Sequence, residues 1–231
     1  MPTTILPDSC VGASVDELPR KLLKQRAYDE IKQQIQENEL AAGTFLSERQ
    51  LASQLGMSKT PVKAALERLE SEGFVAVSPQ QGIVVLDVSV HEIADQFEIR
   101  LALETFVLRS VAGRLNADQV RRINDNLDAQ QLAAENENIS AAVELDAKFH
   151  ALFCEFMGNL EIVRVMARLR ERIHRVIMHV FRQDVSRLKV SLEEHKSIAA
   201  AVLHGDSELA AKCIEEHLQY GKQQLLSPRT R

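Results

Sequence analysis

The chain has 231 residues, of which 45% are hydrophobic, 26% are charged and 4% are aromatic, with no tryptophan. This balance excludes a disordered or fibrous chain, and the scarcity of aromatic residues beside many good helix formers predicts a mainly α-helical protein. The net charge of −5 disfavours a uniformly basic nucleic-acid binder, but residues 20–86 carry 9 basic and 8 acidic groups and are the one positive segment.

Residues 1–19 mix proline, threonine, serine and glycine without any period, which predicts a flexible N-terminal tail. Helical spacing begins at Leu22, and the pair Ala42–Gly43 closes this first segment. Four apolar residues recur on one face of the expected helix: Leu23, Ala27, Ile31 and Ile35.

Two short helices are expected next, joined by a four-residue turn that contains glycine. The first runs from Ser47 to Gly56, and its start matches a capping box in which the side chains of Ser47 and Gln50 each bond to the other residue's backbone N–H. The second runs from Ser58, its N-cap residue, to Gly73. Three apolar residues form its buried stripe: Val62, Leu66 and Leu69.

Beyond the second short helix the pattern changes from helix to strand. The runs Phe74–Val77 and Ile83–Leu86, joined by a turn over Pro79–Gly82, predict a two-stranded hairpin in which Gly82 supplies a positive φ. Two helices joined by a short turn and followed by a hairpin describe a winged helix-turn-helix, here over residues 20–86. In such a unit the first helix braces the second, whose N-terminal residues enter the major groove of double-stranded DNA.

Polar and basic side chains gather where this unit would meet DNA. Arg49 lies in the first turn of the bracing helix, within reach of a phosphate or a base edge. Four more residues lie near the N-terminal end of the second helix, off its buried stripe: Ser58, Lys59, Thr60 and Lys63. We interpret these residues as DNA contacts. The alternative is that they form a solvated face on a small helical module, as most charged helix faces do.

Helical spacing returns after the hairpin and persists through residues 87–231. The expected helices span residues 90–114, 117–137, 140–157, 159–182, 187–203 and 207–226. Because the breaks between them are short, neighbouring helices should pack antiparallel. We therefore expect an all-helical antiparallel bundle that follows the N-terminal winged helix-turn-helix.

One carboxylate and three imidazoles in the bundle have a spacing that favours a metal site. The stretch ELDAKFHALF places Asp146 and His150 one above the other on a helix. His195 and His217 flank Gly205, and if Gly205 turns a helical hairpin, both lie about 15 to 18 Å from the turn and face each other. A helix that brings the first pair to the same level would complete a site with three nitrogen ligands and one oxygen ligand. Such a site suits Zn²⁺, Ni²⁺ or Mn²⁺, with zinc favoured; the alternative is that the histidines occupy solvated or otherwise satisfied positions.

The winged helix-turn-helix segment, residues 20–86, resembles part of a known protein family. The stretches LSERQLASQLGMSKTPVKAALERLESEG and SPQQGIVV resemble the DNA-binding domain of the GntR transcription regulators. The resemblance implies that Arg49, Thr60, Lys63 and Gly82 face DNA, with Gly82 at a wing that enters the minor groove. Lys59 and Lys63 stand where the family usually has arginine, which grips guanine in a bidentate manner that lysine does not reproduce.

Residues 90–226 resemble the all-helical effector-binding domain, the FCD domain, of the FadR-like branch of the same family. The resemblance implies that residues 87–231 serve for effector binding and dimerisation. Metal-binding members carry an Asp-x-x-x-His pair and two later histidines, which this chain matches with Asp146, His150, His195 and His217. The domain often opens with an E-x-R-x-x-x-E element, matched in FEIRLALE by Glu98, Arg100 and Glu104. The resemblance implies that Arg100 points into a cavity and pairs with a carboxylate effector. The alternative is an ion pair between Arg100 and Glu104 along the helix.

No apolar run approaches the roughly 20 residues that a membrane-spanning helix needs, and the N-terminus has no basic stretch followed by an apolar one. We therefore expect a cytoplasmic protein without a membrane partner. The 3 cysteines, Cys10, Cys154 and Cys213, form no Cys-x-x-Cys pair, so neither a disulfide framework nor a thiolate zinc site is indicated.

These observations together predict a ligand-responsive transcription regulator, a homodimeric repressor that binds a palindromic operator and senses a small organic acid through a metal-containing pocket. A metal-dependent hydrolase or lyase that acts on a small carboxylate is the alternative, because such a metal site can also activate water. No further carboxylate is placed as a general base, and an operator-reading module would be superfluous in such an enzyme. A third possibility is a purely structural metal in a bundle that only dimerises.

Overall fold

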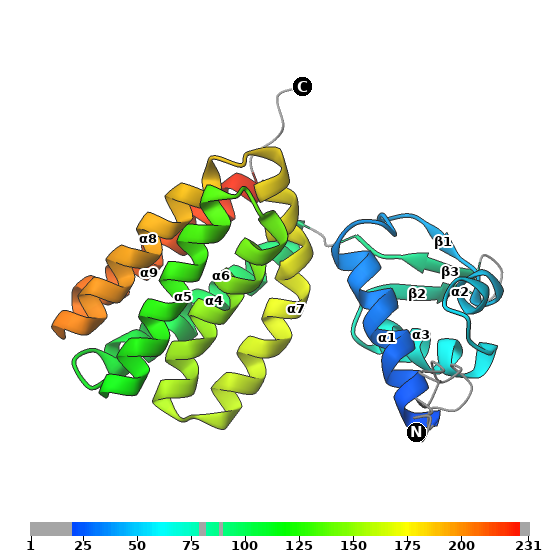
Figure 1. Cartoon of the computed structure of the whole chain (residues 1–231), viewed down its shortest axis with the longest axis horizontal. Helices are drawn as coiled ribbons and strands as arrows, with labels where there is room; N and C mark the ends of the chain where they lie inside the picture. The colour runs from blue at the N-terminus through cyan, green and yellow to red at the C-terminus, as the bar shows by residue number, and fades with distance from the viewer. Residues whose placement is uncertain (1–19, 79–81, 88–89, 227–231) are drawn as a thin grey trace, which may run out of the picture. The chain divides into compact units, whose positions relative to one another are not determined.

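The computed structural model describes residues 20–78, 82–87 and 90–226, and the chain divides into two compact units after Asp87 (Figure 1). The predicted tail, residues 1–19, and most of the predicted hairpin turn, Pro79–Gln81, lie outside the described residues. The mainly α-helical fold with a small sheet in the first unit confirms the predicted fold class. None of the described helices is long and apolar enough to cross a membrane.

The described part of the first unit combines three helices with a small antiparallel sheet (Figure 1). Its elements are α1 (Arg20–Gln36), β1 (Phe45–Leu46), α2 (Glu48–Gln54), α3 (Lys59–Ser71), β2 (Val75–Ser78) and β3 (Gly82–Val85). Strand order is β1-β3-β2, with Phe45 opposite Val84 and Val75 opposite Val85. The core collects the apolar faces of α1 and α3, including Ile31 and Leu69. The predicted apolar stripe of the second short helix is therefore confirmed.

Two details of the secondary structure of the first unit differ from the prediction. The sheet has a third strand, β1, which spans only Phe45–Leu46 and is too short to show a period of its own. Helix α1 ends at Gln36 rather than near Ala42–Gly43, and Asn38 adopts a positive φ of 62°, a conformation that asparagine tolerates. The extra residues form the turn that leads the chain back to β1.

The predicted capping box at Ser47 is wrong in its side-chain bonds. Ser47 and Ser58 both have the extended backbone of an N-cap residue, so the helices start where expected. Neither serine side chain caps its helix. A serine hydroxyl has several staggered rotamers, and the sequence pattern does not select the one that reaches the backbone N–H. Gly82, by contrast, has the positive φ that the hairpin needs, 86°.

The described part of the second unit is a bundle of helices that lie side by side (Figure 1). They are α4 (Val90–Val111), α5 (Ala117–Glu135), α6 (Ile139–Met157), α7 (Leu160–Gln183), α8 (Arg187–His204) and α9 (Ser207–Leu226). These bounds agree closely with the predicted ones, because the breaks carry strong local signals. Asn116 forms a complete capping box with Gln119, and Gly158 and Gly205 end their helices in the left-handed conformation.

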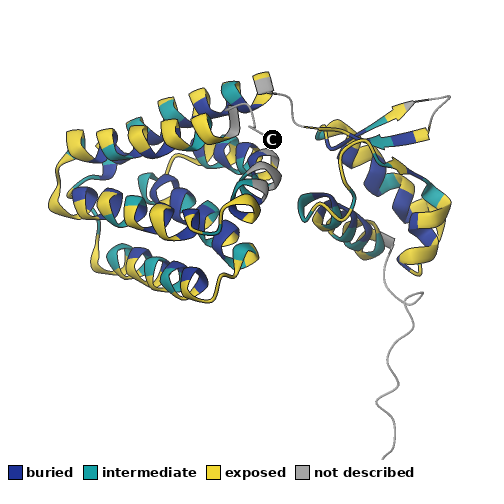
Figure 2. Cartoon of the chain, turned by 90° about the horizontal axis from the view of Figure 1, so that it is seen from above, coloured by how far each residue is buried: buried dark blue, intermediate teal, exposed yellow. Residues whose placement is uncertain are grey.

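Ion pairs at both ends of α4 and α9 show that these two helices run antiparallel. Arg109 of α4 meets Glu208 near the start of α9, and Glu98 meets Lys222 near its end. Each helix has a buried face, made mostly of apolar side chains, and an exposed face (Figure 2). The interior also contains a set of buried polar side chains: Gln96, Arg100, Glu104, Asn126, Gln130, Asp146, His150, Arg187, Ser191, His195 and His217. Buried polar groups need partners, and these residues define the candidate site.

Candidate metal centre and nucleic-acid interface

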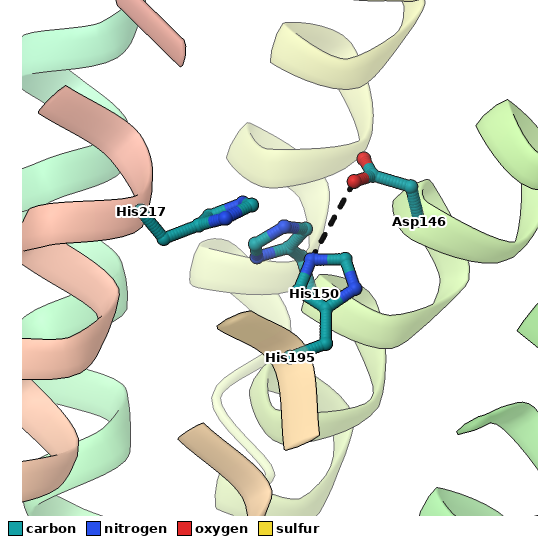
Figure 3. Close-up of side chains that lie close together, drawn as sticks. All are labelled: Asp146, His150, His195 and His217. Atoms are coloured by element: carbon teal, nitrogen blue, oxygen red, sulfur yellow. Dashed lines mark ion pairs between the residues drawn. The ribbon is translucent and has the colours of Figure 1, made fainter. Parts of the chain in front are cut away.

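Four potential metal ligands converge inside the bundle, as the spacing predicted (Figure 3). Asp146 and His150 project from successive turns of α6, while α8 and α9 supply His195 and His217. One ligand atom from each of the four residues lies within 4.8 Å of the others, and all four residues are buried. The distance between His195 Nε2 and Asp146 Oδ1 is 3.5 Å.

Each imidazole in this cluster is held at its Nδ1 atom by a different side chain. His150 Nδ1 lies 2.6 Å from Glu104 Oε2, His195 Nδ1 lies 2.8 Å from Gln130 Oε1, and His217 Nδ1 lies 2.6 Å from Glu194 Oε2. Because a carboxylate or amide oxygen accepts, each Nδ1 donates its hydrogen. The lone pair of each neutral imidazole is then on Nε2.

The Nε2 atoms of two of these histidines make no hydrogen bond to a described residue. His150 Nε2 and His195 Nε2 are both buried and have no hydrogen-bond partner among the described residues. An unpaired buried polar atom costs roughly 1–3 kcal/mol, so native proteins rarely leave one without a reason. Two such atoms, in a cluster with a carboxylate, mark a place where a cation can be bound.

Burial keeps the imidazoles of His195 and His217 in the form that binds metal. Burial lowers the pKa of His195 well below its usual value, and the neighbouring His217 and His150 lower it further. Burial also lowers the pKa of His217, although the hydrogen bond to Glu194 partly offsets this effect. Both rings are therefore neutral at pH 7 and can donate a lone pair.

The two glutamates that contact the histidines, Glu104 and Glu194, are themselves paired with arginines. Glu104 Oε1 accepts from Arg100 Nε at 2.7 Å, so the alternative of an ion pair along the helix is present. Burial alone would raise the pKa of Glu104, but Arg100 and His150 outweigh it and hold that pKa at about 2. Glu194 accepts from both terminal nitrogens of Arg187, at 2.9 and 2.7 Å.

The donor set fits a divalent transition metal. Three imidazoles and one carboxylate are common ligands of such metals, and zinc sites typically hold their histidines through second partners such as these glutamates. The buried cluster is therefore compatible with metal binding.

A small cavity of about 50 Å³ opens onto this cluster. Arg100, Asp146, Arg187, Ser191 and His217 supply its polar wall. The remaining lining is mostly apolar: Phe97, Ile177, Val180, Phe181, Leu218 and Gly221. A cavity with a few convergent polar groups in an apolar wall is the usual form of a small-molecule site.

Sequence reasoning missed several of these residues. Arg187 and Gln130 belong to no motif, and only their tertiary contacts reveal them. Glu194 directly precedes His195, but its contact is with His217 on the next helix, which local spacing does not predict. Glu104 belongs to the E-x-R-x-x-x-E element of its helix, but its contact with His150 on another helix follows from no spacing in the sequence.

The candidate DNA-contacting residues lie on the surface of the first unit. Arg49 is exposed on α2, and Gly82 is exposed at the start of β3. Exposed residues at and near the start of α3 complete the set: Ser58, Lys59, Thr60 and Lys63. The opposite face of α3 is buried, so the helix presents these side chains outward from a fixed support. The DNA contacts themselves remain a prediction.

Comparison with known proteins identifies the class. Residues 23–85 match the family model "Bacterial regulatory proteins, gntR family", and residues 95–220 match the FCD domain. Together these matches cover most of the chain. The protein therefore belongs to the GntR family of bacterial transcription regulators, in the branch that carries an FCD domain.

Relatives and solved structures agree with this assignment. The chain is 27% identical over 201 residues to the HTH-type transcriptional repressor RspR of Escherichia coli, covering 87% of this chain and 88% of that protein. It is 30% identical over 192 residues to an HTH-type transcriptional regulator of Streptomyces ambofaciens, covering 83% of this chain and 80% of that protein. The structure of McbR/YncC from E. coli, 24% identical, has the same fold, with a TM-score of 0.75 over 88% of this chain and 96% of that one.

The protein is thus a DNA-binding transcription regulator, with an N-terminal reading unit and a C-terminal helical domain of the ligand-sensing type. The alternative of a hydrolase or lyase finds no support in these relatives, whose family consists of transcription regulators.

Proposed function

We propose that the protein is a repressor whose FCD domain binds a divalent transition metal and responds to a small carboxylic acid. Asp146, His150, His195 and His217 would hold the metal, with zinc favoured over nickel and manganese. The observation that carries this proposal is the buried convergence of four ligand residues, two of them with unpartnered Nε2 atoms, beside a cavity. When bound, the metal would supply open coordination positions for the acid.

The charges around the cavity favour an anionic ligand. Arg100 and Arg187 bring two positive charges, which Glu104 and Glu194 balance. Asp146 adds one negative charge, so a divalent metal would leave the cluster with a net charge of about +1, a charge that one carboxylate neutralises. The apolar remainder of the lining suits a small organic body attached to that carboxylate.

Arg100 is the cavity residue best placed to meet such an acid. Its Nε donates to Glu104, and no described residue accepts from its two terminal nitrogens. Those nitrogens can bind a carboxylate in the planar, bidentate manner that arginine favours. The ion pair with Glu104 and the predicted role in effector binding are therefore compatible.

The DNA-reading side of the proposal rests on the exposed start of α3. Ser58, Lys59, Thr60 and Lys63 would contact the major groove, Arg49 would contact the backbone or a base edge, and Gly82 would lie at the wing. GntR regulators usually act as dimers, and a homodimer would read a palindromic operator with one reading unit per half-site. The repressor polarity is supported by the repressor name of the E. coli relative.

The bundle offers a physical route from ligand to DNA. The proposed ligand residues and their partners come from α4, α5, α6, α8 and α9, so occupancy of the cluster bears on the packing of most of the bundle. An acid that binds one arrangement of these helices better than another shifts the population toward it. In a dimer, that shift would change the spacing of the two reading units and hence operator affinity.

Elemental analysis and a ligand screen test this proposal together. Purified protein should contain about one metal ion per chain, and a thermal-shift screen of small carboxylic acids should find compounds that stabilise the metal-loaded protein and change its affinity for operator DNA. A protein without bound metal, and unable to bind added Zn²⁺, would refute the metal site. A His195→Ala protein that loses metal but keeps its ligand response would refute the sensing role, and measured turnover of an acid would revive the enzyme alternative.

A further inference from the structure

We propose that Glu104 and Glu194 are positioning residues for the metal ligands, and that each ties one ligand histidine to one cavity arginine. This inference rests on the proposed metal site. It assigns functions to two glutamates and to Arg187. It also predicts that metal affinity depends on Arg100 and Arg187, which bond to these glutamates and not to the ligand histidines.

The first connection runs from α4 to α6. Arg100 Nε donates to one oxygen of Glu104 at 2.7 Å, and His150 Nδ1 lies 2.6 Å from the other oxygen. The exposed fractions of Arg100, Glu104 and His150 are 4%, 3% and 2%, so water does not compete for these bonds. Both oxygens of one buried carboxylate are therefore committed, one to the cavity arginine and one to the metal ligand.

The second connection has the same chemistry but comes from α8 and α9. Arg187 donates to both oxygens of Glu194, and His217 Nδ1 lies 2.6 Å from Glu194 Oε2. The guanidinium of Arg187 also lies over the ring of Tyr220, 4.1 Å from its centroid. Arg187 lines the same cavity as Arg100. Two independent Arg–Glu–His chains thus begin at one cavity and end at two ligands of one cluster.

The third histidine shows that the arrangement is specific to those two. His195 Nδ1 is held by Gln130, whose amide nitrogen donates to Asn126, which in turn donates to the backbone carbonyl of Leu145. This chain is neutral and ends on the backbone, without an arginine. A neutral side chain is therefore enough to orient a histidine in this bundle. The charged partners of His150 and His217 must have a further role.

Charge on the second partner explains the difference. A carboxylate that accepts from Nδ1–H makes the imidazole a stronger electron donor at Nε2 than a neutral amide does, and it fixes the ring orientation. An arginine bound to the same carboxylate partly neutralises its negative charge. An anion that binds the arginine would reduce this neutralisation, so the carboxylate would make the histidine a stronger electron donor. Metal affinity and anion affinity would then be linked, and the linkage is reciprocal.

The test measures Zn²⁺ affinity of the full-length protein by competition with a chromophoric chelator, together with the absorption spectrum of the Co²⁺-loaded protein. Glu104→Gln and Glu194→Gln should each weaken Zn²⁺ binding by about 10-fold to 100-fold and change the Co²⁺ spectrum. Glu98→Gln and Glu193→Gln, at exposed glutamates on the same two helices, should leave both unchanged. Wild-type Zn²⁺ affinity in both of the first two variants would overturn the positioning role.

The arginine end of each chain needs its own variants. Arg100→Lys and Arg187→Lys keep the positive charge but lose the planar guanidinium geometry, and each should weaken Zn²⁺ binding several-fold. Arg122→Lys is the matched control, because Arg122 pairs with Glu155, an exposed glutamate outside the cluster. Unchanged Zn²⁺ affinity in both lysine variants would overturn the link to the cavity arginines.

Two further controls separate the possible outcomes. A single glutamine variant leaves a buried arginine without its partner and can fail to fold. The double variants Arg100→Met with Glu104→Gln and Arg187→Met with Glu194→Gln remove each charge pair together, keep an amide oxygen for the histidine, and should show the same loss of Zn²⁺ affinity. Failure of the wild-type protein to bind Zn²⁺ would overturn the metal site and this inference together, whereas equal binding by wild type and all variants would overturn this inference alone.

Discussion

The imidazole rings of His195 and His217 lie next to each other between two helices that are joined at Gly205, with ring centroids 4.7 Å apart and ring planes tilted by 54°. Both rings are buried, and the Nδ1 atom of each lies against an acceptor oxygen, that of Gln130 for His195 and that of Glu194 for His217. Because the two histidines lie at similar distances from Gly205 along the sequence, the helical hairpin brings them together in a site that can bind a cation.

The first prediction concerns the four proposed ligand residues. Asp146→Ala should lower the bound metal, because the cluster loses its only carboxylate among the four residues. Elemental analysis of the purified variant measures the result, with His204→Ala as control, since His204 is exposed and bonds only to the carbonyl of Ala200 among described residues. Full metal occupancy in the Asp146 variant would contradict the assignment.

Metal removal should destabilise the bundle. Without a cation, His150 Nε2 and His195 Nε2 remain buried without a hydrogen bond to any described residue. Zn²⁺ at about 100 times its dissociation constant adds about 2.7 kcal/mol to the stability, which corresponds to a rise of roughly 10 °C in the midpoint of the bundle transition. Differential scanning calorimetry of chelator-treated protein, before and after Zn²⁺ addition, measures the shift. The midpoint of a His195→Ala protein should respond far less; an equal response would place the stabilising metal elsewhere.

Lys63→Ala should weaken binding to operator DNA and flatten its salt dependence. If Lys63 contacts a phosphate, its loss should reduce the slope of log K against log salt by about one for each protomer that makes the contact. An operator selected from a library of random duplexes provides the DNA, and titrations at several salt concentrations give the slope. Lys196→Ala, at a lysine of the bundle, is the control. A slope equal to that of the wild type would refute the phosphate contact.

Glu72→Gln should destabilise the first unit at neutral pH but not in acid. Glu72 accepts from Tyr28 and Arg68 and lies 3.4 Å from Lys32, so it ties α1 to the end of α3. Burial alone would raise the pKa of Glu72, but these partners outweigh it and lower the pKa below 4.5. A lowered pKa in the folded state means that the carboxylate stabilises the fold above pH 4.5 and that this contribution is lost as the pH falls through the folded pKa.

Urea unfolding of the wild type and of Glu72→Gln between pH 3 and pH 7 measures this effect. The difference in unfolding free energy should shrink as the pH falls and vanish once Glu72 is protonated in the folded wild type. A difference that stays constant over this range would show that Glu72 stabilises the fold through its hydrogen-bond geometry and not through its charge.

Gly113→Ala should cost more stability than Gly158→Ala. Both glycines have a positive φ, 70° and 77°, so each alanine meets a similar backbone strain. A Cβ at Gly113 would also lie 3.1 Å from the Cα of Gly205, whereas a Cβ at Gly158 would meet nothing within 4 Å. The strain itself costs about 1 kcal/mol, and the backbone contact adds to it at Gly113. Chemical denaturation of the two variants gives the difference in unfolding free energy. Equal decreases would show that the backbone near Gly205 moves to accommodate the added Cβ without loss of stability.

The sequence by itself determined the elements and the spacing within each of them. The period of Val62, Leu66 and Leu69 fixed the buried face of α3, and Asn116 and Gly205 fixed helix ends in the bundle, because capping and periodicity act over a few neighbouring residues. The same local geometry put Asp146 and His150 on one face of α6.

Only the tertiary structure decided which side chains meet between elements. It added β1, left Ser47 without its predicted side-chain bond, and brought Arg187 to the cavity. It also gave His150 its partner Glu104 on another helix and His195 its partner Gln130. The register and depth of one helix against the next depend on the packing of whole faces, and no local pattern in the sequence records those distances.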